Sequence, residues 1–265
     1  MQKKAVIVQD ISCFGKCSAA VALPLVSSFN IECALLPTAL LSAHTGFSKY
    51  TCFDLTEQME AALTDWKALE LRFDGFFSGY MLSDCQASLA LETLKSLVKK
   101  DALVLVDPVM GDDGKAYAML NDSFGEKMRS LVARADVITP NLTEAALLLE
   151  KKPLLENYDR AYIEKSLFEL KKLGCKIPMI TGVSFEKGKI GVAFLENDKA
   201  EFVFSKKYDG VTCGTGDTLS SVLFGELLSG ADIRSAVSKA VAATEKAIQS
   251  GVKSYGIDFE CLLHG

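Results

Sequence analysis

The sequence lacks the features that mark membrane, metal-binding and disulfide-rich proteins. No apolar run reaches the ~18 residues of a membrane span, and the start of the chain has no signal-peptide pattern. Only 2 residues are histidine, and the 8 cysteines are scattered without a C-x-x-C pair. A zinc site is therefore not expected, and reduced thiols are the default. These absences predict a cytoplasmic protein that does not associate with membranes.

Several chemical motifs are also missing. The sequence contains no G-x-x-x-x-G-K-[ST] loop, which excludes a P-loop, and no G-x-G-x-x-G after a strand, so a dinucleotide fingerprint is lacking. His44 is the only histidine away from the carboxyl terminus, which makes a Ser-His-Asp triad improbable. The net charge of -5 and the pI of about 5.3 argue against nucleic acid as a partner.

The composition is that of an ordinary globular protein. Hydrophobic residues make up 49% and charged residues 24% of the 265 residues, enough for a sizeable core. No repeat, low-complexity tract or linker divides the chain. We therefore expect one domain over residues 1–265.

Apolar runs and amphipathic stretches alternate along the chain. Because such alternation is typical of parallel sheets covered by helices, we predict a three-layer α/β/α fold with a central, mostly parallel sheet. A further apolar run at 32–41 is broken at Pro37, and Asp54 is the expected N-cap of the second helix. The predicted strands are 5–8, 75–80, 103–107, 136–139 and 178–181, with a β-hairpin at 190–195 and 201–204. The predicted helices are 18–29, 54–66, 83–99, 124–133, 142–149, 158–173, 217–228 and 233–249.

Polar residues follow the apolar runs at many of the predicted strand ends. In an open α/β sheet, ligands bind beyond the carboxyl ends of the strands. The recurrence of polar residues at these strand ends predicts one shared crevice. These residues are Asp10, Thr45, Tyr80, Asp107, Asn141 and Thr181.

The stretch from Cys213 to Asp217 reads Cys-Gly-Thr-Gly-Asp and leads directly into an apolar helix. Free N–H groups at a helix start favour an anion such as phosphate. Asp217 beside them could take a proton from a substrate hydroxyl, so the stretch has two requirements of phosphoryl transfer. The motif alone is equally compatible with Thr215 or Asp217 as a simple helix cap.

Two further strand ends carry carboxylates. Asp107, Asp112 and Asp113 follow one buried strand, and hard oxygen ligands of this kind suit Mg²⁺. The alternative is a solvated Asp-rich turn. Asn141 and Glu144 follow the next strand, and they could equally form a helix capping box.

Taken together, the motifs resemble a known group. The segments Asp107-Pro-Val-Met-Gly-Asp112, Thr139-Pro-Asn-Leu-Thr-Glu144 and Gly214-Thr-Gly-Asp217 resemble the ribokinase superfamily, and within its vitamin-kinase branch the pyridoxal kinases. His44-Thr45-Gly46-Phe47 is similar to that family's H-T-G-Y turn, and Gly79-Tyr80 to its G-Y pair. The ordered set covers nearly the whole chain and is far more specific than any one motif.

The resemblance implies an ATP-dependent kinase that phosphorylates the 5′-hydroxymethyl group of a vitamin B6 vitamer (pyridoxal, pyridoxamine or pyridoxine) for salvage to pyridoxal phosphate. Asp217 would be the general base, and the backbone of Gly214, Thr215 and Gly216 would form the anion hole. ATP and Mg²⁺ are the implied cofactors, and a homodimer is the implied assembly; a need for K⁺ stays open. The residues implied at these ligands are Asp107 and Glu144 at the metal, and Asp112, Thr139, Asn141 and Thr181 at the nucleotide.

The resemblance also implies a substrate pocket, and here the sequence departs from the family. Thr45 and Tyr80 would line the pyridine ring. Asp10 stands where the family usually has serine, and Ser12 could substitute for that serine. A carboxylate there favours a protonated ring nitrogen or a cationic amine, so we hypothesise a bias toward pyridoxamine or a related aminomethylpyrimidine.

Two alternatives remain. Hydroxymethylpyrimidine kinase, of thiamin biosynthesis, shares the D-P-V-M and T-P-N-L elements, but it commonly has cysteine where this chain has Asp217, and its Gly-rich opening is absent. A non-catalytic vitamin-binding protein is the alternative of a different class. The presence of Asp217 beside two glycines weighs against it.

Overall fold

A single nine-stranded sheet runs through the molecule, in the order β11-β10-β9-β8-β5-β4-β1-β2-β3. This computed structural model describes residues 2–118, 121–210, 213–253 and 255–263. The neighbouring pairs from β2 to β9 are all parallel, and β3, β10 and β11 add antiparallel edges. The strands of the sheet are β1 (Lys4–Ser12), β2 (Glu32–Leu41), β3 (Cys52–Asp54), β4 (Phe73–Ser78), β5 (Val98–Val106), β8 (Val137–Ile138), β9 (Ile177–Val183), β10 (Lys189–Glu196) and β11 (Lys199–Lys206).

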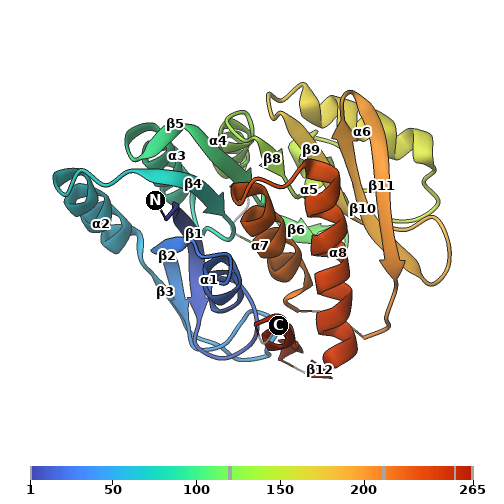
Figure 1. Cartoon of the computed structure of the whole chain (residues 1–265), viewed down its shortest axis with the longest axis horizontal. Coiled ribbons are helices and arrows are strands. Elements are labelled where there is room, and N and C mark those ends of the chain that lie inside the picture. The colour runs from blue at the N-terminus through green and yellow to red at the C-terminus, as the bar shows by residue number, and fades with distance from the viewer. Residues whose placement is uncertain (1, 119–120, 211–212, 254, 264–265) are drawn as a thin grey trace.

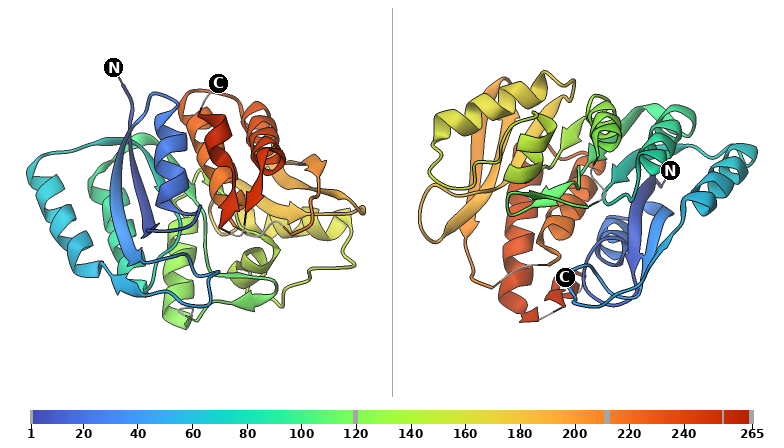
Figure 2. Two further views of the ribbon diagram at one scale, coloured as in Figure 1. Left: turned by 90° about the horizontal axis from the view of Figure 1, so that it is seen from below. Right: turned by 180° about the vertical axis from the view of Figure 1, so that it is seen from behind.

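Helices cover both faces of this sheet (Figure 1). One face packs against α1, α7 and α8, and the other against α2 to α6, as the view from behind also shows (Figure 2). The helices are α1 (Ala19–Ser27), α2 (Thr56–Ala68), α3 (Asp84–Ser96), α4 (Asp122–Val132), α5 (Leu142–Leu148), α6 (Arg160–Lys171), α7 (Thr215–Leu228) and α8 (Ile233–Ser250). Two small hairpins, β6 (Gly111–Asp112) with β7 (Lys115–Ala116) and β12 (Val252–Lys253) with β13 (Gly256–Ile257), and the 3-10 helix η1 (Phe259–Leu262) complete the described elements. The predicted α/β/α fold is confirmed.

Successive side chains along each strand point to opposite faces of the sheet, and each face has its own hydrophobic core. Ile7, Phe77 and Leu105 point to the α1, α7 and α8 side, whereas their neighbours Val6 and Phe76 point to the other side. Strands buried on both faces read as continuous apolar runs because each side chain has a helix to pack against. None of the helices in the described part of the chain is both long and apolar enough to cross a membrane.

Two local predictions were wrong. β2 runs unbroken through Pro37. Proline is tolerated there because β3 pairs with β2 only from Ala39 onward, so the side of Pro37 that faces β3 has no partner strand. The N-cap of α2 is Leu55 rather than Asp54, although the Asp54 carboxylate accepts the N–H of Thr56 at 2.8 Å. The predicted hairpin of β10 and β11 is confirmed.

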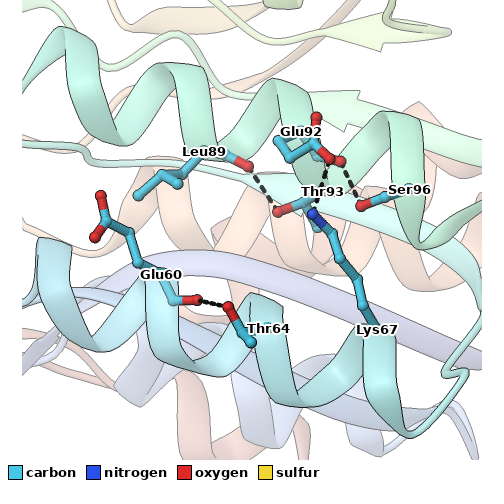
Figure 3. Close-up of polar contacts among 7 residues, drawn as sticks. All are labelled: Glu60, Thr64, Lys67, Leu89, Glu92, Thr93 and Ser96. Carbon is cyan, nitrogen blue, oxygen red and sulfur yellow. Dashed lines mark hydrogen bonds and ion pairs between the residues drawn. The ribbon is translucent and has the colours of Figure 1, made fainter.

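The outer helices α2 and α3 are joined by an ion pair between Lys67 and Glu92, with 2.8 Å between Nζ and Oε1 (Figure 3). Thr93 and Ser96 of α3 donate their hydroxyl groups to carbonyls one turn back. Lys67 lies near the end of α2, shortly before β4 begins, and therefore at the amino edge of the parallel strands. The residues picked out from the sequence lie at the opposite edge.

Candidate active site

The amino end of α7 is open to an anion. Its N-cap is Gly214, with a φ of 83°, and no side chain caps the helix. A Cβ on Gly214 would meet the Lys16 carbonyl at 2.4 Å, so only glycine fits, whereas a Cβ on Gly216 would have no atom within 4 Å. The first-turn N–H groups of a helix have no acceptor within the helix, and the dipole favours negative charge there. This end can therefore bind phosphate.

Asp217 lies in the first turn of α7. Burial, and then the charge of Asp10, raises its pKa to about 6, although the nearby backbone N–H of Ser18 opposes the rise. The carboxyl is about half ionised near pH 6 and largely ionised at neutral pH. A carboxylate with this pKa, next to an open anion site, can act as a general base on a hydroxyl.

A second carboxylate, Asp107, belongs to the same electrostatic site. Ser220, one helical turn after Asp217, donates to Asp107 at 3.1 Å, and its hydroxyl lies 3.1 Å from that of Thr139. Burial, and then the charge of Asp217, raises the pKa of Asp107 to about 7. The ends of β5 and β8 thus meet the start of α7, as the crevice prediction requires.

Asn141 and Glu144 form a complete capping box at the start of α5. The Glu144 carboxylate accepts the N–H of Asn141 at 2.9 Å and that of Met110 at 3.1 Å, and the Asn141 amide donates to the Gly111 carbonyl at 2.9 Å. Burial, and then Asp107, raises the pKa of Glu144 well above its usual value. The capping interpretation is confirmed, and the ligand interpretation stays a prediction.

Direct metal ligands are few at this edge. Among the residues that the structure describes, no three His, Cys, Asp or Glu gather closely enough to hold a metal ion on their own. Asp112 lies on the β6–β7 hairpin with its side chain partly exposed, and partial burial of the carboxyl, then the charge of Asp113, raises its pKa. Thr181 lies across from Asn141 and bonds to the Pro140 carbonyl. A magnesium ion here would need water or phosphate oxygens to complete its shell.

The predicted substrate residues lie near the carboxyl ends of the neighbouring strands β1, β2 and β4. Asp10 is 3% exposed and accepts the Ser12 hydroxyl at 3.2 Å; burial raises its pKa. Tyr80 is half-buried, and burial raises its pKa, with Asp10 among the nearby charges. Thr45 is exposed on the turn after β2. The structure therefore brings Asp10, Ser12 and Tyr80 near one another, and Thr45 lies at the surface.

His44 joins the turn after β2 to the rest of the site. It is buried between Gly15 and Gly46, where a Cβ would meet the imidazole ring at 2.1 Å and 2.8 Å. Its Nδ1 accepts the Gly46 N–H at 3.1 Å and lies 3.9 Å from the thiol of Cys213. Burial lowers the pKa of His44. The close packing explains why glycine flanks this histidine.

The sequence did not reveal three residues of the site. Ser220 could have been found, because residues three apart on a helix share a face. Tyr117, after the β6–β7 hairpin, has its pKa raised to about 12 by burial and then by Asp112 and Glu144, so its phenol lies near the acidic cluster. The backbone N–H of Ser18 lies close enough to Asp217 to oppose the rise in its pKa, and no local pattern indicates that contact.

The fold places the protein in the ribokinase-like class. A structure of a candidate phosphomethylpyrimidine kinase from Bacteroides thetaiotaomicron, in an orthorhombic form with pyridoxal, is 32% identical to this chain, with a TM-score of 0.94 over 100% of this chain and 95% of that one. The pyridoxal kinase from Lactobacillus plantarum is 28% identical, with a TM-score of 0.90 over 99% and 96%.

Sequence comparison identifies the family. The model of the phosphomethylpyrimidine kinase family matches residues 44–258, so the chain belongs to this family and to the vitamin-kinase branch that its motifs resemble. The hydroxymethylpyrimidine/phosphomethylpyrimidine kinase of Helicobacter pylori is 29% identical over 170 residues, 63% of this chain and 60% of that relative. The alignment thus spans less than two thirds of that relative's length.

Proposed function

We propose that the protein transfers the γ-phosphate of ATP to the 5′-hydroxymethyl group of a vitamin B6 vitamer. The observation that carries this proposal is Asp217, a carboxylate with a pKa of about 6 beside the uncapped amino end of α7. Asp217 accepts the hydroxyl proton, and the N–H groups of the first turn, at Thr215 and Gly216, stabilise charge on the transferring phosphoryl group. Gly214 leaves the backbone free to approach that group.

The acidic cluster supports a divalent cation. Burial, and then repulsion by neighbouring carboxylates, raises the pKa values of Asp107, Asp112 and Glu144, and a nearby cation would relieve this excess of negative charge. Bound Mg²⁺ would supply charge neutralisation at the phosphates of ATP. Asp107 is the best direct ligand, whereas Glu144 acts by holding Asn141 and Met110 in place. Thr139 and Thr181 line the nucleotide side.

Two observations favour a B6 vitamer as the substrate: the predicted substrate residues and the similarity to a solved structure. Ser12 donates to Asp10, and Asp10 lies near Tyr80 and near Asp217. A structure similar to this chain was determined with pyridoxal. Thr45, on the exposed turn after β2, is the fourth residue that we assign to the substrate. The family match and the Helicobacter relative favour the second candidate, phosphorylation of hydroxymethylpyrimidine.

The test is ADP release by the purified protein with Mg-ATP and each of pyridoxal, pyridoxamine, pyridoxine and hydroxymethylpyrimidine. We expect saturable turnover on the B6 vitamers. Turnover on hydroxymethylpyrimidine alone would move the protein to the thiamin pathway. No turnover on any of the four, with ligand binding retained, would instead indicate a vitamin-binding protein.

We also propose a homodimer in the cytoplasm. Leu40 and Phe53 are cross-strand neighbours on β2 and β3 at the edge of the sheet, and their side chains are exposed. Exposed apolar pairs at a sheet edge are common places for self-association. Light scattering after size exclusion, with Phe53→Glu as the comparison, measures the assembly.

A further inference from the structure

Lys16 lies in the loop between β1 and α1 and is more buried than a surface lysine. Its Nζ is 2.6 Å from Glu260 and 3.6 Å from Asp258, and it lies 5.7 Å from the centre of the Phe259 ring. Only 15% of the side chain is exposed. All three partners belong to the carboxyl-terminal segment, defined here as residues 255–262.

The backbone of Lys16 joins the same segment to the anion loop, defined here as residues 213–217. The Lys16 N–H donates to the Tyr255 carbonyl at 2.7 Å, and the Lys16 carbonyl packs directly against Gly214. The N–H of Ile257 donates to the Cys213 carbonyl at 3.3 Å. Three segments distant in sequence therefore meet at one lysine.

Ser18, two positions after Lys16, connects this junction to the proposed base. Its φ of 52° is in the left-handed region, which costs a non-glycine residue free energy and requires support from its surroundings. Ser18 lies close to both carboxylates, because its backbone N–H opposes the rise in the Asp217 pKa and its hydroxyl opposes the rise in the Asp10 pKa. Movement of the first loop, defined as residues 13–18, would change both surroundings together.

We propose that Lys16 is a positioning residue: its ion pair with Glu260 clamps the first loop between the carboxyl-terminal segment and the anion loop, and so holds the first turn of α7, with Asp217, in its working orientation. The kinetic consequence rests on the proposed kinase function, whereas the clamp itself does not. A small displacement of a reacting group, of about 1 Å, can lower a rate by about 10²-fold. The clamp therefore controls turnover without touching the substrate.

The kinetic test compares Lys16→Met, which keeps the aliphatic stem, with Lys67→Met, which breaks an ion pair of similar length far from the site. We expect kcat on the preferred vitamer to fall about tenfold or more in Lys16→Met, with the KM for ATP changed by less than about threefold. Lys67→Met should match the wild type. Lys16→Arg, which restores the charge, should recover at least about half of the lost rate, a rescue that a merely structural role would not give.

A second measurement does not depend on catalysis. Hydrogen–deuterium exchange of the first loop and the anion loop should be faster in Lys16→Met than in the wild type, and unchanged in Lys67→Met. If Lys16→Met does not fold, Glu260→Gln tests the same ion pair from the exposed side, with the same two readouts. Wild-type kcat together with wild-type exchange in both loops would overturn the clamp. A wild-type protein without turnover would overturn the proposed function alone, and the exchange data would still decide the clamp.

Discussion

The helices α5 and α7 both carry an acidic residue in the first turn, but the two carboxylates have different partners. Each has an acidic residue at the third helical position: Glu144 in α5 and Asp217 in α7. Glu144 folds back onto the N–H of its own N-cap, Asn141, and closes the helix end. Asp217 makes no such bond to its own N-cap, Gly214, and no side chain caps α7.

This difference determines where an anion can bind. At α5 the N–H groups of Asn141 and Glu144 already have side-chain acceptors, and the Glu144 carboxylate would repel a phosphate. At α7 the donors are unopposed, because Gly214 has no side chain and Gly216 opens onto space. The capped amino end of α5 therefore holds neighbouring backbone in place, whereas the uncapped amino end of α7 can bind the transferring phosphoryl group.

Exchanging the two acids for amides should give the largest contrast. Asp217→Asn removes the proposed base, so we expect kcat to fall by about 10²-fold or more with little change in melting temperature. Glu144→Gln places an amide NH₂ against backbone donors, so we expect a lower melting temperature and a smaller loss of kcat. Steady-state kinetics and thermal unfolding of both variants measure this. Equal losses of rate would remove the distinction between the two helix ends.

The pH dependence sharpens the same contrast. A base works only when deprotonated, and the Asp217 pKa of about 6 lies above the usual value of 3.8. We therefore expect kcat/KM to rise with pH and level off above about pH 7, rather than above pH ~5 as an unperturbed carboxyl would give. Asp217→Asn should lose this acid limb. Saturation of kcat/KM already at about pH 5 would contradict the raised pKa.

The next largest effect concerns the glycines of α7. Gly216→Ala adds a methyl group to the open side, so we expect a normal melting temperature and a kcat about tenfold lower, because the methyl group occupies the phosphate position. Gly214→Ala is the matched variant: its φ of 83° and its contact with Lys16 predict lost stability as well. A fully active Gly216→Ala would exclude this face of α7 as the anion site.

A smaller effect is expected at the closed helix end. Asn141→Ala removes the cap of α5 and the tether to Gly111, which should lower the free energy of unfolding by about 1 kcal/mol. Urea denaturation measures this change, with Asn121→Ala, which removes the cap of α4, as the control. A loss of stability confined to Asn121→Ala would mean that α5 does not depend on its capping box.

The smallest effect should come from Asp10. Asp10→Ser restores the residue usual in the pyridoxal kinases, so we expect the ratio of kcat/KM for pyridoxamine over pyridoxal to fall by a few-fold, worth about 1 kcal/mol. Ser12→Ala, which removes only the hydroxyl that bonds to Asp10, serves as the comparison. An unchanged order of substrates would refute the bias that we assign to this carboxylate.

The sequence predicted those features that depend on residues close together in the chain. Strand and helix order followed from apolar periodicity, and the Asn141–Glu144 box followed from its spacing. Pro37 misled because a proline is tolerated in a strand next to a sheet edge. The contact of Ser18 with Asp217, the junction at Lys16 and the packing of Gly15 against His44 join segments far apart in sequence, and no local pattern encodes them.

The most direct test of the central claim is a crystal structure of the protein with ADP, pyridoxal and aluminium fluoride, which mimics the transferring phosphoryl group. We predict the fluoride complex within hydrogen-bond distance of the first-turn N–H groups of α7, with Asp217 facing the hydroxyl of pyridoxal. A fluoride complex at the amino end of α5, or a hydroxyl that faces Glu144 instead, would contradict the assignment of the base.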